Sequence, residues 1–306
     1  MLKNSKQSMD IGIRISIISI ILNIILSVLK VFAGIFSHSS ALISDGVHSA
    51  SDVFSSIVVI IGLNISHKKA DKEHPYGHER MESICALFLA IILIATGFGI
   101  GFSGVKNIVT HTIQEVTGYL ALICAIVSIV VKEVQYQYTR IIAKRQHSDS
   151  LMADAWHHRS DALSSVGSSI GVIGAMAGLP ILDSIASIVI SFFVIYAGYE
   201  ILKEAINKLV DKSCSDEVVS EIENVITSQE GVMGIDEFKT RLFGSKIYVD
   251  VTILIYGNTL LSEAHAISER THDAVESAFP DVKHCMIHIH PYNSIDEKSV
   301  PLQRVS

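Results

Sequence analysis

The chain has 306 residues, of which 49% are hydrophobic and only 18% are charged, and its formal net charge is −7. A soluble domain normally carries about 25% charged residues, so this composition argues against an ordinary soluble protein. The negative net charge argues against nucleic acid as a partner.

Six apolar stretches are each long enough to cross about 30 Å of hydrocarbon. We therefore predict an all-α, six-helix transmembrane domain over residues 1–205. Beyond it the sequence becomes charged and alternating, which predicts a cytoplasmic α+β domain over 206–295 and a flexible tail over 296–306. The six predicted spans are 12–36, 40–66, 82–105, 117–137, 151–178 and 181–203.

The basic residues predict the orientation of these spans. The loops near 37–39, 106–116 and 178–182 offer only Lys106, whereas the N-terminus and the loops 67–80 and 132–149 are rich in Lys and Arg. By the positive-inside rule the N-terminus is cytoplasmic, and six spans return the C-terminus to the same side. We expect a multi-pass protein of the cell membrane. The basic residues on the cytoplasmic side are Lys3, Lys6, Arg14, Lys68, Lys69, Lys72, Arg80, Lys132, Arg140, Lys144 and Arg145.

A twelve-residue pattern occurs in both the second and the fifth span, as DGVHSASDVFSS from Asp45 and as DAWHHRSDALSS from Asp154. In each copy the Asp, the His three residues later and the second Asp share one face of a helix. A carboxylate in hydrocarbon is costly unless it is compensated. Two imidazoles and two carboxylates suit a tetrahedral divalent metal, whereas Asp–His hydrogen bonds between two helices are the structural alternative. The predicted transport site is His48, Asp52, His157 and Asp161.

The loop ADKEHPYGHERMES, between the second and third spans, carries Asp71, His74 and His78. A turn around Pro75 and Gly77 would bring the three side chains together, which predicts a cytoplasmic metal site. The alternative is a simple turn with exposed histidines.

After residue 205 the pattern predicts helix, strand, strand, helix and strand, with strands over 246–255 and 282–290 and a helix over 260–278. His288 and His290 lie two residues apart and therefore on one face of a strand. His265 and Asp236 could join them in a metal site, and solvent-facing histidines are the alternative. His272 and His284 are expected to be exposed.

Four segments, ALISDGVHSASDVFSS, ADKEHPYGHERME, ADAWHHRSDALSS and IHIHP, resemble the cation diffusion facilitator family in order and spacing. The resemblance implies a homodimeric exporter with a ferredoxin-like, metallochaperone-like cytoplasmic domain, which exchanges Zn(II) or a related ion for protons. It also implies a dimer-stabilising metal cluster, with Asp250 as a substitute ligand on the face of Thr252. The matching positions are Asp236, Thr252, His265, His288 and His290.

The expected function is proton-coupled efflux of divalent metal, with protons, membrane lipid and a second copy of the chain as partners and no required cofactor. A two-imidazole, two-carboxylate site favours Zn(II), Co(II) or Cd(II) over Mn(II), and zinc leads. The loop, however, resembles the iron/zinc and manganese branches of the family, so Fe(II) and Mn(II) stay open. No HExxH motif occurs, which argues against an intramembrane enzyme. A metal receptor or scaffold that does not transport is the remaining alternative.

Overall fold

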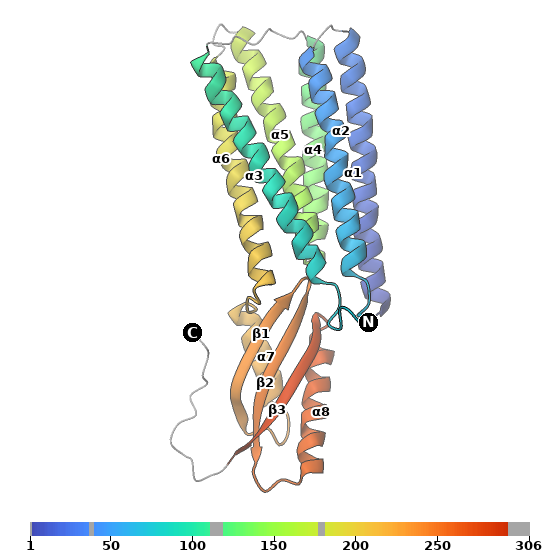
Figure 1. Cartoon of the computed structure of the whole chain (residues 1–306), viewed down its shortest axis with the longest axis vertical. Coiled ribbons are helices and arrows are strands. Elements are labelled where there is room, and N and C mark those ends of the chain that lie inside the picture. The colour runs from blue at the N-terminus through green and yellow to red at the C-terminus, as the bar shows by residue number, and fades with distance from the viewer. Residues whose placement is uncertain (1, 37–39, 111–118, 177–180, 293–306) are drawn as a thin grey trace. The chain divides into compact units, whose positions relative to one another are not determined.

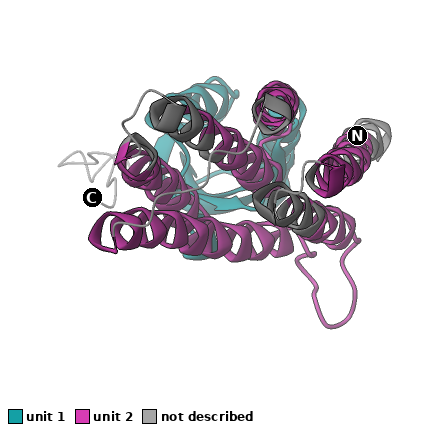
Figure 2. Ribbon diagram, turned by 90° about the horizontal axis from the view of Figure 1, so that it is seen from above, with its two compact units in different colours: residues 1, 207–306 teal, residues 2–206 magenta. Residues whose placement is uncertain are grey.

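The computed structural model describes residues 2–36, 40–110, 119–176 and 181–292, and some side chains at helix ends, that of His48 among them, lie outside the description. The predicted tail 296–306 also lies outside it. The chain divides into two compact units, 2–206 and 207–306 (Figure 2).

The first unit consists of six long helices (Figure 1). Their regular apolar runs favour helix because hydrocarbon leaves no other way to pair the backbone of a single segment. Ser148 marks one boundary, since its hydroxyl accepts a hydrogen bond from the Leu151 N–H at 3.3 Å in the first turn of the fifth helix. The helices are α1 (Leu2–Phe36), α2 (Ser40–Ser66), α3 (Arg80–Val109), α4 (Tyr119–Gln146), α5 (Asp149–Met176) and α6 (Ile181–Leu209).

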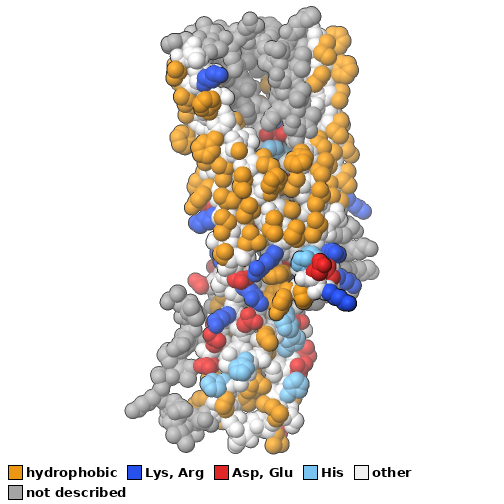
Figure 3. All heavy atoms as spheres, viewed as in Figure 1, with side chains coloured by type: hydrophobic (Ala, Val, Ile, Leu, Met, Phe, Trp, Pro, Cys, Tyr) orange, Lys and Arg blue, Asp and Glu red, His pale blue; other side chains and the backbone are white. Residues whose placement is uncertain are grey.

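This helical unit has apolar side chains outside and polar side chains inside. On α1, Ile17 and Ile21 are exposed, whereas Ser19 and Asn23 are buried. On the face in view, Figure 3 shows hydrophobic side chains over most of the described part of the helices. The arrangement is that of a protein whose outer solvent is lipid. Among the described residues, the stretches Ile11–Ala33 and Arg80–Val109 are by themselves long and apolar enough to cross a membrane.

The second unit confirms the predicted order of helices and strands. It contains α7 (Asp216–Thr227), β1 (Gly234–Phe243), β2 (Lys246–Tyr256), α8 (Leu261–Ala278) and β3 (Val282–Tyr292). The sheet has the order β1-β2-β3, in which β1 and β2 are antiparallel and β2 and β3 are parallel.

The core of this α+β unit lies between one face of the sheet and the two helices. Val249, Val251 and Ile253 alternate along β2 and are buried against Ile222 of α7 and Val275 of α8. The alternate residues of β2, which include Asp250 and Thr252, therefore point to the opposite face.

Candidate metal centre

Three of the four predicted transport-site side chains meet inside the helical unit. Asp52 comes from α2, and His157 and Asp161 lie one turn apart on α5. His157 Nε2 is 3.4 Å from Asp52 Oδ1 and 4.0 Å from Asp161 Oδ2. All three residues are buried, and one ligand atom from each lies within 4.8 Å of the others. His48 lies in α2, but its side chain is outside those described. The geometry allows one divalent ion to contact both carboxylates and the imidazole together.

A lysine, Lys132, joins this cluster. The sequence predicts Lys132 in a cytoplasmic loop, and that prediction is wrong, because the residue lies within α4 and is 1% exposed. Its ammonium donates to Asp52 Oδ2 at 2.7 Å and to Asp161 Oδ2 at 2.9 Å. The signal was available in the sequence, since Lys132 falls inside the predicted span 117–137. A buried cation there neutralises half of the charge of the two carboxylates.

The first Asp of the second motif copy is held by serines of the first copy. Ser55 and Ser56 of α2 donate to Asp154 Oδ1 of α5 at 3.3 and 3.4 Å. His158 Nε2 lies 3.5 Å from Asp154 Oδ2, and both residues are fully buried. The repeat thus supplies two layers: the second Asp of each copy belongs to the candidate metal cluster, and Asp154 ties α5 to α2 beside it.

The second buried lysine of the helical unit pairs internally. Lys30 of α1 is 3% exposed, and its ammonium donates to the Ser49 hydroxyl of α2 at 3.0 Å. It therefore contributes to the packing of α1 on α2 inside the apolar unit.

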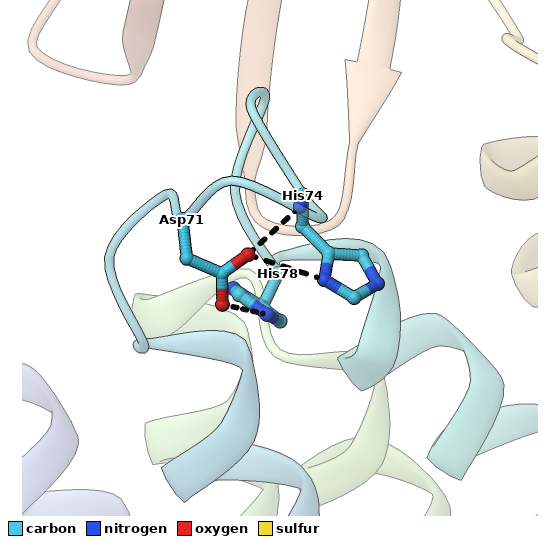
Figure 4. Close-up of side chains that lie close together, drawn as sticks. All are labelled: Asp71, His74 and His78. Carbon is cyan, nitrogen blue, oxygen red and sulfur yellow. Dashed lines mark hydrogen bonds and ion pairs between the residues drawn. The ribbon is translucent and has the colours of Figure 1, made fainter.

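The loop residues Asp71, His74 and His78 form a second cluster (Figure 4). Asp71 Oδ1 lies 3.5 Å from His74 Nδ1, and Asp71 Oδ2 lies 3.5 Å from His78 Nε2. The two imidazole rings lie 4.5 Å apart. Gly77, with φ of +99°, permits the turn that returns the chain toward His78.

Asp71 is held in its ionised form by the loop itself. Its Oδ1 accepts the His74 backbone N–H at 2.8 Å, and its Oδ2 accepts the Lys68 ammonium at 3.2 Å. The His74 N–H first, and then Lys68, lower the pKa of the Asp71 carboxyl to about 2. The carboxylate is therefore available as a ligand throughout the neutral and mildly acidic range.

The metal cluster predicted in the second unit, which we also call the cytoplasmic unit, is only partly assembled within one chain. Asp236, at a bulge in β1, reaches His290 of β3, with 3.0 Å between Oδ2 and Nδ1. His288 pairs in register with Thr252 and so lies on the same face, which is also that of Asp250. His265 is exposed on α8, and α8 covers the opposite face. Within the described residues, none of the three-membered clusters of ligand groups includes these positions.

A third cluster joins His272, Glu276 and His284. The sequence predicts that the two histidines are exposed. His284 is exposed, but His272 is half-buried. The spacing of His272 and Glu276 by four residues on a helix was a signal, but only the fold brings β3 beside them.

Two consecutive parts of the chain match the two domains of a known protein family. Residues 16–210 match the cation efflux transmembrane domain, and residues 214–292 match the cytoplasmic domain of cation efflux proteins. The predicted family, the two-part fold and the absence of an enzymatic role are thereby confirmed.

Relatives from distant organisms match over almost the full chain. A transporter of Methanocaldococcus jannaschii is 34% identical over 89% of this chain and 96% of its own. The manganese efflux system protein MneP of Bacillus subtilis is 31% identical over 92% of this chain and 97% of its own. Metal tolerance protein C1 of Arabidopsis thaliana is 35% identical over 87% of this chain, which spans 59% of that longer protein. The chain belongs to the cation diffusion facilitator family and is an integral membrane transporter for the efflux of metal cations.

Proposed function

We propose that this transporter exports divalent transition-metal ions from the cytoplasm in exchange for protons. The observation that supports it most directly is the buried convergence of Asp52, His157 and Asp161. Two carboxylates and an imidazole in an apolar unit form a site that needs positive charge, and a metal ion or protons can supply it.

The exchange follows from the chemistry of the ligands. A metal requires ionised carboxylates and a neutral imidazole, so metal and protons compete for the same groups. A site that faces the cytoplasm near pH 7 loads metal. The same site, when it faces a more acidic exterior, releases metal and carries protons back. We propose that α2, α4 and α5, which carry the cluster, move to alternate its access.

Besides the metal ion and the protons, the ammonium of Lys132 is a third cation at this site. It donates hydrogen bonds to one oxygen of Asp52 and one of Asp161, so a metal that coordinates those oxygens must displace it. A second buried acceptor lies on the neighbouring helix α1, where the side-chain oxygen of Asn23 has no hydrogen-bond partner among the described residues. Gln135, one turn beyond Lys132 on α4, donates to the Ser19 carbonyl of α1 at 3.3 Å. Asn23 follows Ser19 by one turn, and Lys132 precedes Gln135 by one turn. With α1 and α4 antiparallel, Asn23 and Lys132 therefore lie at a similar level. We propose that Lys132 moves toward Asn23 when metal binds.

The loop cluster is proposed to collect metal on the cytoplasmic side. Asp71, His74 and His78 lie in the segment between α2 and α3, in a loop that also carries Lys68, Lys69 and Lys72. From the positive-inside rule we propose that the loop and both chain termini lie in the cytoplasm. We also propose that the membrane is the plasma membrane.

Zinc is the proposed leading substrate, with Fe(II), Co(II), Cd(II) and Mn(II) as competitors. Imidazole from His157, and from His48 if its side chain completes the site, suits Zn(II) better than the harder Mn(II). The relative named as a manganese efflux protein supports Mn(II) as the principal competitor. We further propose a homodimer, held by the cytoplasmic unit, because that unit matches the family's dimerisation domain.

The test is flux through purified protein in liposomes that contain a pH dye and a metal dye, challenged with each ion separately. We expect metal flux coupled to opposite proton flux, fastest for Zn(II), and lost in Asp161→Asn. The matched control is Glu133→Gln, which removes an acid of α4 that is paired with Gln137 rather than with the cluster. Metal flux without proton flux would overturn the coupling. Metal binding without flux of any ion would favour a receptor.

A further inference from the structure

The cytoplasmic unit holds a group of three ligand side chains at the outer edge of its sheet. His272 and Glu276 lie one turn apart on α8, and His284 lies near the start of the edge strand β3. His272 Nε2 is 3.2 Å and His284 Nδ1 is 3.5 Å from the same carboxylate oxygen, Glu276 Oε1. The two imidazole rings are 5.6 Å apart. Three ligand groups thus converge on a single point beside the strand.

The backbone of β3 fixes two of the three groups. The Cys285 N–H donates to Glu276 Oε1 at 3.2 Å, and the Cys285 carbonyl lies 2.7 Å from His272 Nδ1. A carbonyl only accepts, so His272 Nδ1 must carry the hydrogen. A metal-binding histidine is commonly oriented in this way, with one ring nitrogen bonded to a carbonyl and the other left for the metal.

This hydrogen position leaves an electrostatic problem that a cation would solve. In the neutral imidazole the Nε2 atom of His272 carries a lone pair, and it faces the lone pairs of the Glu276 carboxylate at 3.2 Å. Two acceptors at this distance repel each other unless a proton or a metal ion lies between them. Protection of the edge strand β3 would explain the hydrogen bonds that His272 and Glu276 make to the Cys285 backbone. It does not explain why His284 Nδ1 also lies close to Glu276 Oε1, beside the Cys285 nitrogen and His272 Nε2.

We infer that His272, Glu276 and His284 form a divalent transition-metal site of the cytoplasmic unit, separate from the transport and loop sites. Two imidazoles and one carboxylate are a ligand set that proteins use for Zn(II), with water in the fourth position. His284 is the exposed member, so the water side faces solvent. The ligand set favours Zn(II) or Co(II) and disfavours Mg(II), which prefers an all-oxygen shell. Bound metal would fasten α8 to β3.

The experiment measures bound metal per protomer on the full-length detergent-purified protein, with Zn(II), Co(II) and Mg(II) as separate probes. His272→Asn keeps an N–H for the Cys285 carbonyl, and Glu276→Gln keeps an acceptor for the Cys285 N–H. Both variants therefore preserve the link between helix and strand. Asp273→Asn, which removes an exposed acid from the same turn of α8, is the matched control.

We expect His272→Asn, Glu276→Gln and His284→Asn each to lose about one equivalent of Zn(II) and of Co(II), with the control unchanged and no Mg(II) bound by any form. A matching decrease in the Co(II) absorption bands of imidazole-bound ion in the same variants would support the site independently. Full Zn(II) stoichiometry in all three variants would overturn it and show that a proton occupies the cluster. Metal flux in liposomes should persist in these variants, so failure of this site and failure of the transport site are distinguishable.

Discussion

At the scale of single residues, Lys132 distinguishes the proposed transport site from a simple set of four ligands. Its ammonium is shared by two buried carboxylates and neutralises half of their charge. Loss of one partner from a buried charge group typically costs about 3–5 kcal/mol of stability. We therefore expect the lysine to stabilise the protein and, at the proposed site, to compete with metal through the same contacts.

Replacement of this residue in Lys132→Met should lower the thermal unfolding temperature without metal and raise Zn(II) affinity about tenfold or more, a change of about 1.4 kcal/mol. Added Zn(II) should restore the lost stability, because a ligand that binds only the folded state stabilises it. Unfolding scans with and without Zn(II) provide the measurement. Lys106→Met, which removes an exposed lysine of α3, is the control. Unchanged Zn(II) affinity in Lys132→Met would show that lysine and metal do not compete.

Asp71 provides a residue-scale prediction with a definite dependence on pH. Its folded pKa of about 2 is below the usual 3.8, so its ionised form supports the loop above about pH 4, and this support is lost as the pH falls toward 2. Between about pH 4 and neutral pH the Asp71 carboxylate is therefore ionised and available as a metal ligand.

Asp71→Asn should weaken Co(II) binding to the loop about tenfold or more at any pH above 4, because the ionised carboxylate is lost as a ligand. Titration of Co(II) into full-length protein that carries Asp52→Asn and Asp161→Asn isolates the loop from the transport site. Glu73→Gln removes a neighbouring acid whose carboxylate is outside the cluster and should bind normally. Unchanged Co(II) affinity in Asp71→Asn would show that this carboxylate is not a ligand of the loop cluster.

At the scale of elements, α3 and α6 approach closely through reciprocal glycines. A Cβ on Gly97 of α3 would lie 2.7 Å from Ile195 Cγ1 and 3.2 Å from the Ile195 backbone nitrogen. A Cβ on Gly198 of α6 would lie 2.7 Å from Ile94 Cγ1. Helices in lipid associate largely through such close packing of small residues.

Gly97→Ala should therefore destabilise the helical unit by about 1–3 kcal/mol, because the new methyl group meets backbone as well as side chain. Gly99→Ala, two residues away, is the matched control, since a Cβ there meets no atom within 4 Å. The control should be neutral or slightly stabilising, as alanine favours helix. Unfolding midpoints of the two variants in the same detergent decide the question, and equal midpoints would argue against close packing at Gly97.

The same scale shows which features the sequence could predict. The length of an apolar run and the alternation of apolar and polar residues both reflect the surroundings of a segment. The helices and the strands β2 and β3 were therefore predictable from the local sequence pattern. The prediction of a loop position for Lys132 was wrong because it followed the charge of the side chain, and only the packing of α4 against α2 and α5 shows its partners. His272 and His284 likewise belong to separate elements, and their meeting depends on the parallel pairing of β2 and β3.

At the scale of the whole molecule, the two units have separate cores. The helical core includes Leu63, Leu93 and Val194, and the core of the second unit includes Val251 and Val275, with no residue in common. Each unit therefore buries its own apolar surface, the first also against lipid. The transport cluster lies entirely on α2, α4 and α5, whereas the proposed dimer contacts belong to the second unit.

A chain that ends after residue 210, which keeps α6 intact, should therefore still fold and bind Zn(II) at the transport cluster. Because it lacks the proposed dimer-forming unit, we expect a larger monomer fraction in detergent and slower, but proton-coupled, flux in liposomes. Size-exclusion chromatography with light scattering measures the monomer fraction, and circular dichroism checks that the helices persist. Asp161→Asn in the shortened chain should abolish the residual flux. Retained helix with no Zn(II) binding would mean that the second unit is needed to form the metal site itself.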